Sequence, residues 1–271
     1  MLCRTQKINT LLFIIYFAIF ALSGCSTARS IAKKNGFTEV LVQGNEFVFT
    51  TFQKITDNNA GYVIYIEGDG TIVNGNQIST NPTPRKPMMI QLATSDPRPN
   101  IVYIGRPCQY TPMYMNPVCN CAYWTHKRWS MDAVDAMNDA INKIAKGHKR
   151  HLIGFSGGGG IAVLIAARHK NVADIITIGG CLDHEAFNEY HKTVPSTESL
   201  NPIDFAKQIN HIPQLHISGE RDTRVPQFIA KKYIEASNSP CVINKLLPKV
   251  SHNSGWIENW HEVLNMKIGG S

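Results

Sequence analysis

The residues Gly154-Phe155-Ser156-Gly157-Gly158 form a G-x-S-x-G motif directly between a strand-like apolar run and a helix-like apolar run. A serine on a sharp strand-to-helix turn is forced into a strained backbone conformation. Its neighbours two residues away must then lack side chains to avoid collision, and Gly154 and Gly158 meet that requirement. The turn raises the serine hydroxyl above the sheet, beside the free N–H groups of a helix N-terminus. We therefore predict that Ser156 is a nucleophile.

A glycine-rich phosphate-binding loop is the alternative interpretation of the same five residues. The sequence has no G-x-x-x-x-G-K-[ST] at this place, and the dinucleotide-binding fingerprint is not matched either. The nucleophile interpretation is therefore favoured.

A serine hydroxyl is a weak nucleophile and needs a base that a third group orients. In this architecture the expected chain order is serine, acid, histidine. Asp222 follows the strand-like run 214–217, and His252 follows the last strand-like run, 242–247. Both lie in strand-to-helix loops, at the edge of a parallel sheet where catalytic groups gather. We predict His252 as the base and Asp222 as the acid. Two other acidic residues remain alternatives to Asp222, namely Glu220 and Asp183.

Acyl transfer also needs hydrogen-bond donors for the oxyanion that develops in the transition state. One donor should be the backbone N–H of Gly157, directly after the nucleophile. The second should come from the loop after the strand-like run 62–66, where we nominate the N–H of Asp69 and keep Gly70 as the alternative. The acidic side chains of this loop must point away from an oxyanion or pair with cations. A tight turn with no further role is the other interpretation of this loop.

The elements that must position these residues follow a simple order along the chain. Two strand-like runs, 39–42 and 47–52, are separated by Gly44-Asn45, which predicts an antiparallel hairpin. Further strands are predicted at 62–66, 101–104, 151–155, 175–178, 214–217 and 242–247. Helices are predicted at 130–144, 161–168, 226–237 and 255–266, with Ser130 placed to cap the first. This order predicts an α/β fold: a mostly parallel sheet with an N-terminal antiparallel hairpin and helices on both faces.

The domain organisation is predicted to be simple. The chain of 271 residues is 43% hydrophobic and 17% charged, as ordinary globular proteins are, and it shows no internal repeat or composition break. We predict a single domain over residues 37–271, preceded by a short polar tether over 26–36. The only long insertion between strand–helix units, residues 181–212, could form a small cap over the active site.

The N-terminus has the layout of a secretory signal peptide. A short basic segment, 1–7, precedes an apolar run, 11–21, that is too short for a membrane span of about 20 residues. The next four residues, Leu22-Ser23-Gly24-Cys25, resemble the lipobox of bacterial lipoproteins. An uncleaved anchor helix with a chance cysteine is the alternative.

The lipobox resemblance implies that residues 1–25 are a lipoprotein signal peptide ending at a lipidated Cys25. Two or more acyl chains would hold the folded part firmly outside the cytoplasm, since each buried CH₂ contributes about 0.8 kcal/mol. Ser26 fits the outer-membrane sorting pattern, which implies the periplasmic face of that membrane in the cell envelope.

The charged residues do not indicate a nucleic-acid partner. The net charge of +7 is spread along the chain, and no run of Lys and Arg is interleaved with aromatic residues. We therefore expect no nucleic acid among the partners.

Export would place the remaining cysteines in an oxidising compartment, where cysteines that lie close together in a loop usually pair. Cys108 with Cys119 or Cys121 would close a loop of about a dozen residues. A zinc site is the competing interpretation. Cys119 and Cys121 have a single residue between them, and no well-spaced Cys or His pair completes four ligands. We therefore expect a disulfide and no metal.

The mature chain from about Phe37 resembles the α/β-hydrolase superfamily in its strand order, nucleophile turn, acid loop and histidine loop. Several runs further resemble a subgroup of poorly characterised proteobacterial α/β-hydrolase lipoproteins: Tyr65–Gly70, Gly105–Tyr110, Tyr123–Thr125, Leu182–His184, the Gly-x-x-Asp-x-x-Val-Pro of 219–226, and His252–Trp256. By that resemblance Cys119 is the partner of Cys108, and Cys121 is an extra thiol. The chain departs from many lipases at the oxyanion loop, where Glu67-Gly68 replaces His-Gly.

Together these features predict an envelope-anchored serine hydrolase that cleaves an ester or related acyl substrate through an acyl-enzyme on Ser156. No metal or organic cofactor is expected. The expected partners are a small-molecule or lipid-like acyl substrate and the membrane, through the lipid anchor. A peptidase or amidase would use the same triad, and a catalytically silent, membrane-tethered binding protein would keep the same fold.

Overall fold

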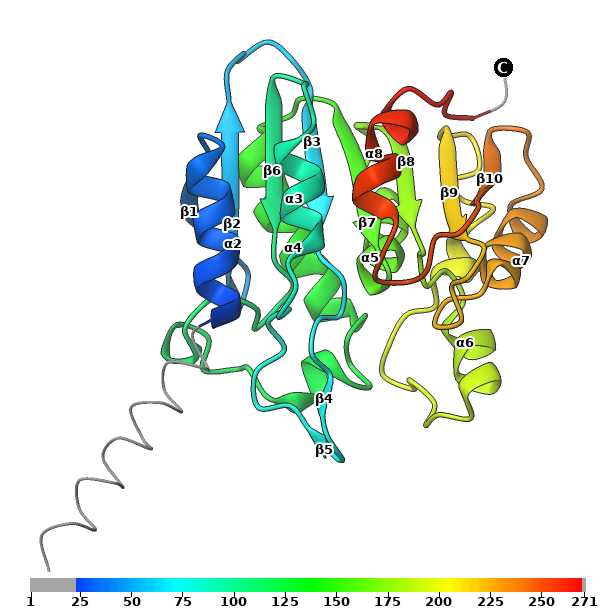
Figure 1. Ribbon diagram of the computed structural model, residues 1–271, viewed down its shortest axis with the longest axis horizontal. Helices are drawn as coiled ribbons and strands as arrows, with labels where there is room; N and C mark the ends of the chain where they lie inside the picture. Colours follow the sequence, from blue (N-terminus) through cyan, green and yellow to red (C-terminus); the bar gives the residue numbers. More distant parts are fainter. Residues whose placement is uncertain (1–22, 270–271) are drawn as a thin grey trace, which may run out of the picture.

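A computed structural model describes residues 23–269 of the chain, and an eight-stranded sheet lies at its centre (Figure 1). Its strands are β1 (Thr38–Gly44), β2 (Phe47–Ile55), β3 (Tyr62–Ile66), β6 (Asn100–Ile104), β7 (Arg150–Phe155), β8 (Val172–Ile178), β9 (Gln214–Gly219) and β10 (Val242–Leu247). Their order across the sheet is β1-β2-β6-β3-β7-β8-β9-β10. β2 pairs antiparallel with β1 and β6, and the other neighbours are parallel. This confirms the predicted α/β fold with its N-terminal hairpin.

Burial explains why the central strands are continuous apolar runs. Every residue of β3 and β6 is buried, because helices cover the sheet on both faces. The edge strand β1 has mostly exposed or half-buried residues, and the turn into β2 places Asn45 in the left-handed conformation with φ 45°. The predicted hairpin is therefore confirmed at the turn as well as in the strands.

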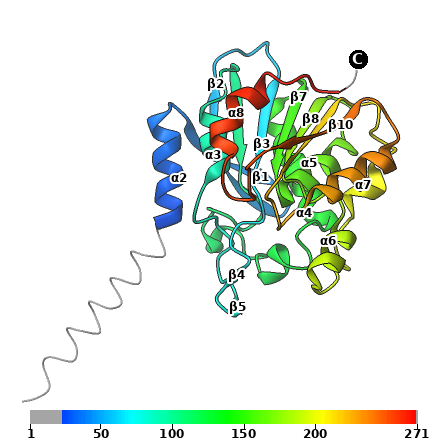
Figure 2. The same ribbon diagram turned by 45° about the vertical axis from the view of Figure 1, so that its right-hand side comes forward.

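The helices form two layers on opposite faces of the sheet, as the two views show (Figures 1 and 2). One layer contains α2 (Ser23–Lys34), α3 (Met88–Thr94) and α8 (Trp256–Leu264). The other contains α4 (Met131–Ala145), α5 (Gly157–Ala166) and α7 (Gln227–Ser237). The helix predicted at 161–168 starts earlier in the structure, where α5 begins at Gly157. Ser130 stands at the N-cap of α4 as predicted, but its side chain makes no capping hydrogen bond.

The segment 26–36, predicted as a polar tether, is different in the structure. It belongs largely to α2, and two alanines one turn apart, Ala28 and Ala32, are buried against the sheet face that also holds Phe52. Arg29 forms an ion pair with Glu39 at 2.9 Å. The polar composition was misleading, because the core contact of this helix needs few apolar residues: Ala28 and Ala32 are buried, and Ile31 packs beside them.

The predicted signal peptide falls mostly outside the described residues, and the side chain of Cys25 is not among those described. Within residues 23–269, no helix combines the length and the apolar character that crossing a bilayer requires.

Three loops lie beyond the carboxyl ends of the parallel strands, at the lower edge in Figure 1. The first carries a small hairpin of β4 (Val73–Asn74) and β5 (Gln77–Ile78). The second, after β6, contains the 3-10 turns η1 (Met113–Met115) and η2 (Cys121–Trp124). The third is the insertion 181–212, which folds as α6 (His184–His191) followed by a loop and η3 (Pro202–Phe205).

Candidate active site

Ser156 occupies the turn between β7 and α5 with φ 52° and ψ −120°, a conformation that a side chain rarely adopts. The flanking glycines are required for close approach. A Cβ on Gly154 would lie 2.2 Å from the carbonyl oxygen of Gly158, and one on Gly158 would lie 2.4 Å from the carbonyl oxygen of Glu67. The predicted strain at the serine, and the predicted need for glycine on both sides, are therefore present in the structure.

The structure brings Ser156, His252 and Asp222 together. Nε2 of His252 lies 3.1 Å from Oγ of Ser156, and its Nδ1 lies 2.8 Å from Oδ2 of Asp222. The three residues are separated by up to 96 positions in the chain, yet each is at least nine-tenths buried. The imidazole can thus accept the serine proton at one nitrogen while the carboxylate holds the other nitrogen.

Backbone and ring contacts hold the histidine and the acid in place. Oδ1 of Asp222 accepts hydrogen bonds from the N–H groups of Arg224 and Val225 at 2.9 and 2.8 Å, which leaves Oδ2 for the histidine. The indole of Trp256 donates to the carbonyl of His252 at 2.9 Å. These contacts restrict both side chains before any substrate arrives, which is what efficient general-base catalysis needs.

The two alternative acids lie elsewhere. Glu220 accepts a hydrogen bond from the N–H of Lys249 at 2.8 Å. Asp183 caps α6 through the N–H groups of Glu185 and Ala186 and forms an ion pair with Lys232 at 3.1 Å. Of the three candidate acids, Asp222 is the one that contacts His252.

The predicted oxyanion residues, Asp69 and Gly157, are in contact with each other. A Cβ on Gly157 would lie 1.9 Å from Oδ1 of Asp69, so the carboxylate packs directly against the glycine. Among the described residues, neither backbone N–H has a hydrogen-bond acceptor. Both groups are therefore free to donate to a ligand.

Two arginines compensate the acidic side chain of Asp69, and neither was predicted from the sequence. Arg106, after β6, donates from Nη1 to Oδ1 of Asp69 at 3.0 Å and from Nη2 to the carbonyl of Arg128. Nε of Arg128 lies 3.7 Å from Oδ2 of Asp69. Burial, together with the nearby charge of Arg128, lowers the pKa of Arg106. The sequence predicted that the acidic side chains of this loop would point away or pair with cations, but it did not indicate which residues those cations are.

Glu67, the other acid of the loop, points into the protein. The hydroxyl of Tyr103 donates to its Oε2 at 2.7 Å, and the N–H of Gly68 donates to its Oε1 at 2.8 Å. Burial raises the pKa of this carboxyl from 4.5 to about 7, against the lowering effect of those hydrogen bonds and of Arg106. Glu67 therefore fixes the start of the loop after β3 through buried hydrogen bonds.

The loop after β6 is closed by a disulfide between Cys108 and Cys119, and Cys121 is free and exposed. Two residues at its start, Cys108 and Tyr110, have left-handed backbones with φ 69° and 61°. Asn116 fixes the middle of the loop by exchanging two hydrogen bonds with the backbone of Val48. The loop that carries Arg106 is therefore tied down at several points.

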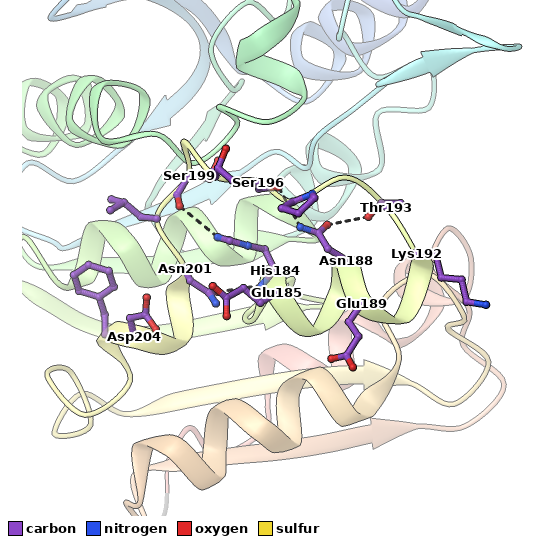
Figure 3. A pocket seen from close by; sticks show the side chains of 14 residues that line it. His184, Glu185, Asn188, Glu189, Lys192, Thr193, Ser196, Ser199, Asn201 and Asp204 are labelled. Carbon is purple, nitrogen blue, oxygen red and sulfur yellow. Dashed lines mark hydrogen bonds between the residues drawn. The ribbon is translucent and has the colours of Figure 1, made fainter.

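The insertion 181–212 contacts the nucleophile turn through Trp129. The indole of Trp129 donates to the carbonyl of Gly157 at 2.8 Å and stacks on His184 of α6, with ring centroids 5.6 Å apart. A pocket of about 700 Å³ lies inside the insertion, between α6 and the loop that follows it. Figure 3 shows His184 and Asn188 pointing from α6 toward that loop. The lining of this pocket includes neither Ser156 nor His252, so it is separate from the triad.

Among residues 23–269, no group of three or more His, Cys, Asp or Glu side chains is arranged to hold a metal ion. Cys181 follows β8 next to the nucleophile turn, where its N–H donates to the carbonyl of Ser156 at 2.9 Å. Burial raises the pKa of its thiol to about 12, so it is a neutral side chain at physiological pH.

No protein-family model matches the sequence, and no curated protein matches it. Solved structures match its fold. A proline iminopeptidase from Mycobacterium smegmatis has a TM-score of 0.62 at 13% identity, over 83% of this chain and 95% of that chain. Est1E from Butyrivibrio proteoclasticus has a TM-score of 0.58 at 11% identity, over 83% and 95%. The Pyrococcus furiosus esterase Pf2001 has a TM-score of 0.59 at 12% identity, over 84% and 87%. The chain therefore has the α/β-hydrolase fold, and similarity at this level of identity concerns the fold alone.

Proposed function

We propose that the protein is a serine hydrolase that cleaves an ester or related acyl substrate. The observation that carries this proposal is the position of His252, within hydrogen-bonding distance of both Ser156 and Asp222. A serine hydroxyl with an oriented imidazole on one side and a carboxylate behind it is the arrangement that activates a serine for acyl transfer.

In the proposed reaction, Oγ of Ser156 attacks the acyl carbon while Nε2 of His252 accepts the hydroxyl proton. The carbonyl oxygen becomes an oxyanion that the N–H groups of Gly157 and Asp69 stabilise. His252 then gives its proton to the leaving group, which departs and leaves an acyl-enzyme. Water attacks that ester by the same steps in reverse, with His252 again as the base. Asp222 holds the imidazole in the tautomer that both steps require.

A fluorophosphonate probe tests the proposal without knowledge of the substrate. The full-length protein purified in detergent should be labelled at Ser156, and Ser156→Ala should abolish labelling without lowering the Tm appreciably. Ser95→Ala, which changes a serine at the end of α3, is the matched control and should be labelled like wild type. Labelling at another serine would remove Ser156 from its role. Absence of labelling would favour the catalytically silent binding protein.

A peptidase or amidase remains the alternative, because it would use the same three residues. Matched 4-nitrophenyl ester and 4-nitroanilide substrates with the same acyl group separate the two activities. The proposal expects ester cleavage with a larger kcat/KM than anilide cleavage. A larger kcat/KM for the anilide than for the ester would instead indicate a peptidase or amidase.

We further propose that the protein is a lipoprotein of the cell envelope, anchored through Cys25 at the periplasmic face of the outer membrane. The lipobox-like Leu22-Ser23-Gly24-Cys25 and the resemblance to proteobacterial lipoproteins support this proposal. A palmitate analogue should label wild type and Cys121→Ser equally, and it should not label Cys25→Ser. Label retained in Cys25→Ser would exclude that residue as the lipid acceptor.

A further inference from the structure

The guanidinium of Arg128 is largely buried between aromatic side chains and has no hydrogen-bond acceptor among the described residues. Only 9% of the residue is exposed. Its Cζ lies 4.2 Å from the ring centroid of Trp129 and 5.9 Å from that of Phe187 on α6. Among the described residues, none accepts a hydrogen bond from this group, and its buried Nε has no hydrogen-bond partner at all. The nearest anion, Asp69, is 3.7 Å from Nε, beyond hydrogen-bonding distance.

Asp69 is already committed to the other arginine. Arg106 binds its Oδ1 at 3.0 Å, so one carboxylate faces two guanidinium groups and leaves one positive charge in excess. Two other acids lie nearby. Glu67 interacts electrostatically with Arg106, but neither Glu67 nor Asp183 forms an ion pair with Arg128. Glu67 is bound by Tyr103 and the N–H of Gly68. Asp183 caps α6 and pairs with Lys232.

This positive charge lies beside the nucleophile. Asp69, which Arg128 approaches, packs against Gly157, and Trp129, on which Arg128 stacks, donates a hydrogen bond to the carbonyl of that same glycine. Arg128 also lies over the ring of Phe187, which belongs to α6 of the insertion. The guanidinium is therefore placed between the nucleophile turn and α6, where a substrate on Ser156 would extend.

We propose that Arg128 is a substrate-binding residue that receives an anionic oxygen group, a carboxylate or phosphate, of the ester that Ser156 cleaves. This inference rests on the proposed hydrolase function. A guanidinium presents its N–H donors as a planar fork that matches such groups, and stacking on Trp129 holds the plane in place. A largely buried cation without hydrogen-bond acceptors is costly, and a bound anion would supply the missing acceptors.

The test compares matched esters that differ only in one charge. On the acyl side, 4-nitrophenyl hydrogen glutarate is compared with 4-nitrophenyl pentanoate. On the leaving-group side, 4-acetoxybenzoate is compared with its neutral methyl ester. Arg128→Met keeps an unbranched side chain that can pack on Trp129 but removes the charge, and Arg128→Lys keeps the charge but removes the fork. Lys127→Met, which removes an adjacent charge paired with Glu198 at 2.9 Å, is the control for general electrostatics.

Arg128→Met should lower kcat/KM for at least one of the anionic esters by about 10- to 100-fold, mainly through KM, and change the neutral esters less than threefold. The kcat/KM of Arg128→Lys for that anionic ester should lie between the values of wild type and Arg128→Met. Lys127→Met should have the kcat/KM of wild type. The pair that responds shows whether the anion belongs to the acyl or the leaving group. An equal loss on charged and neutral esters, or equal effects of the two charge-removing variants, would overturn the proposal.

A binding measurement separates this inference from the proposed function. Glutarate and 4-hydroxybenzoate are the products that carry the distinguishing carboxylate of the two charged esters, and at least one of them should raise the Tm of wild type and of Ser156→Ala. Neither should raise the Tm of Arg128→Met. If the fluorophosphonate probe leaves Ser156 unlabelled but this shift persists, the hydrolase proposal fails and the anion site stands. If Ser156 is labelled and no anion shifts the Tm, the anion site fails alone.

Discussion

The carboxylate of Asp69 occupies the space that a side chain at position 157 would need, since a Cβ on Gly157 would lie 1.9 Å from its Oδ1. Arg106 holds this carboxylate at 3.0 Å from its Nη1. The two residues whose N–H groups we propose as oxyanion donors are thus fixed relative to each other by direct contact. The separation of those donors depends on a glycine at position 157.

Gly157→Ala should therefore reduce activity without removing an N–H group. The added methyl group would push Asp69 away, and the second donor would move with it. We expect kcat to fall by about 10- to 100-fold, somewhat less than full loss of an oxyanion donor. Gly61→Ala is a control with a milder contact, 3.1 Å from the carbonyl of Lys149, at the other end of β3. Steady-state kinetics check the effect, and wild-type kcat in Gly157→Ala would contradict the proposed oxyanion site.

Asp222→Asn should keep the fold and cut turnover by about 10⁴-fold, because an amide favours the wrong tautomer of His252. Fluorophosphonate labelling of Ser156 should slow in parallel with turnover. Glu220→Gln changes the neighbouring acid, which does not touch the histidine, and should stay close to wild type. If Glu220→Gln were inactive and Asp222→Asn active, the role of the acid would pass from Asp222 to Glu220.

Glu67 should make stability depend on pH. Burial raises the pKa of its carboxyl from 4.5 to about 7. Between these pH values the folded protein retains a proton that the unfolded chain has lost, so the free energy of unfolding falls as pH rises through this window and levels off above it. Glu67→Gln cannot titrate and should remove on the order of 3 kcal/mol of that dependence.

Urea unfolding of wild type and Glu67→Gln at pH 4.5 and pH 8 measures this effect. The wild type should lose stability relative to the variant at the higher pH. A constant difference between the two proteins at both pH values would show that Glu67 does not titrate in this range.

Reduction of the disulfide between Cys108 and Cys119 should lower the free energy of unfolding by about 2–4 kcal/mol. Because Asn116 also ties this loop to β2, the folded loop should stay ordered after reduction, and the loss should come mainly from the greater freedom of the unfolded chain. Cys119→Ser should reproduce the effect of reductant on the Tm, and Cys121→Ser should not. Peptide mapping without reductant should recover residue 108 linked to 119, and a link to 121 would refute the pairing.

The nucleophile, acid and histidine could be proposed from the sequence because each follows a run that forms a strand in the parallel part of the sheet. Chain order and strand ends then place all three at one edge of the sheet. The cations that pair with Asp69 could not be proposed in this way. Arg106 is 37 positions away, and only the neighbourhood of β3 and β6 in the sheet makes them meet.

The helix α2 was missed for a related reason. Its buried residues are two small alanines, with Ile31 packed beside them. So short an apolar contact carries little signal in a polar sequence, and its burial depends on a sheet formed later in the chain. The pocket inside the insertion 181–212 could not be predicted either, because it depends on how α6 packs against the loop that follows it.

The position of α2 also determines which edge of the sheet would lie near the membrane if Cys25 carried a lipid. Arg29, one turn after Cys25, donates from Nη2 to the carbonyl of Tyr110 at 3.2 Å, in the loop beyond the carboxyl end of β6. The first turn of α2 therefore lies at the same edge of the sheet as the triad (Figures 1 and 2). A lipid on Cys25 would bring that edge close to the bilayer surface. Substrate released within the membrane would then reach the enzyme by lateral diffusion in two dimensions rather than through bulk solvent.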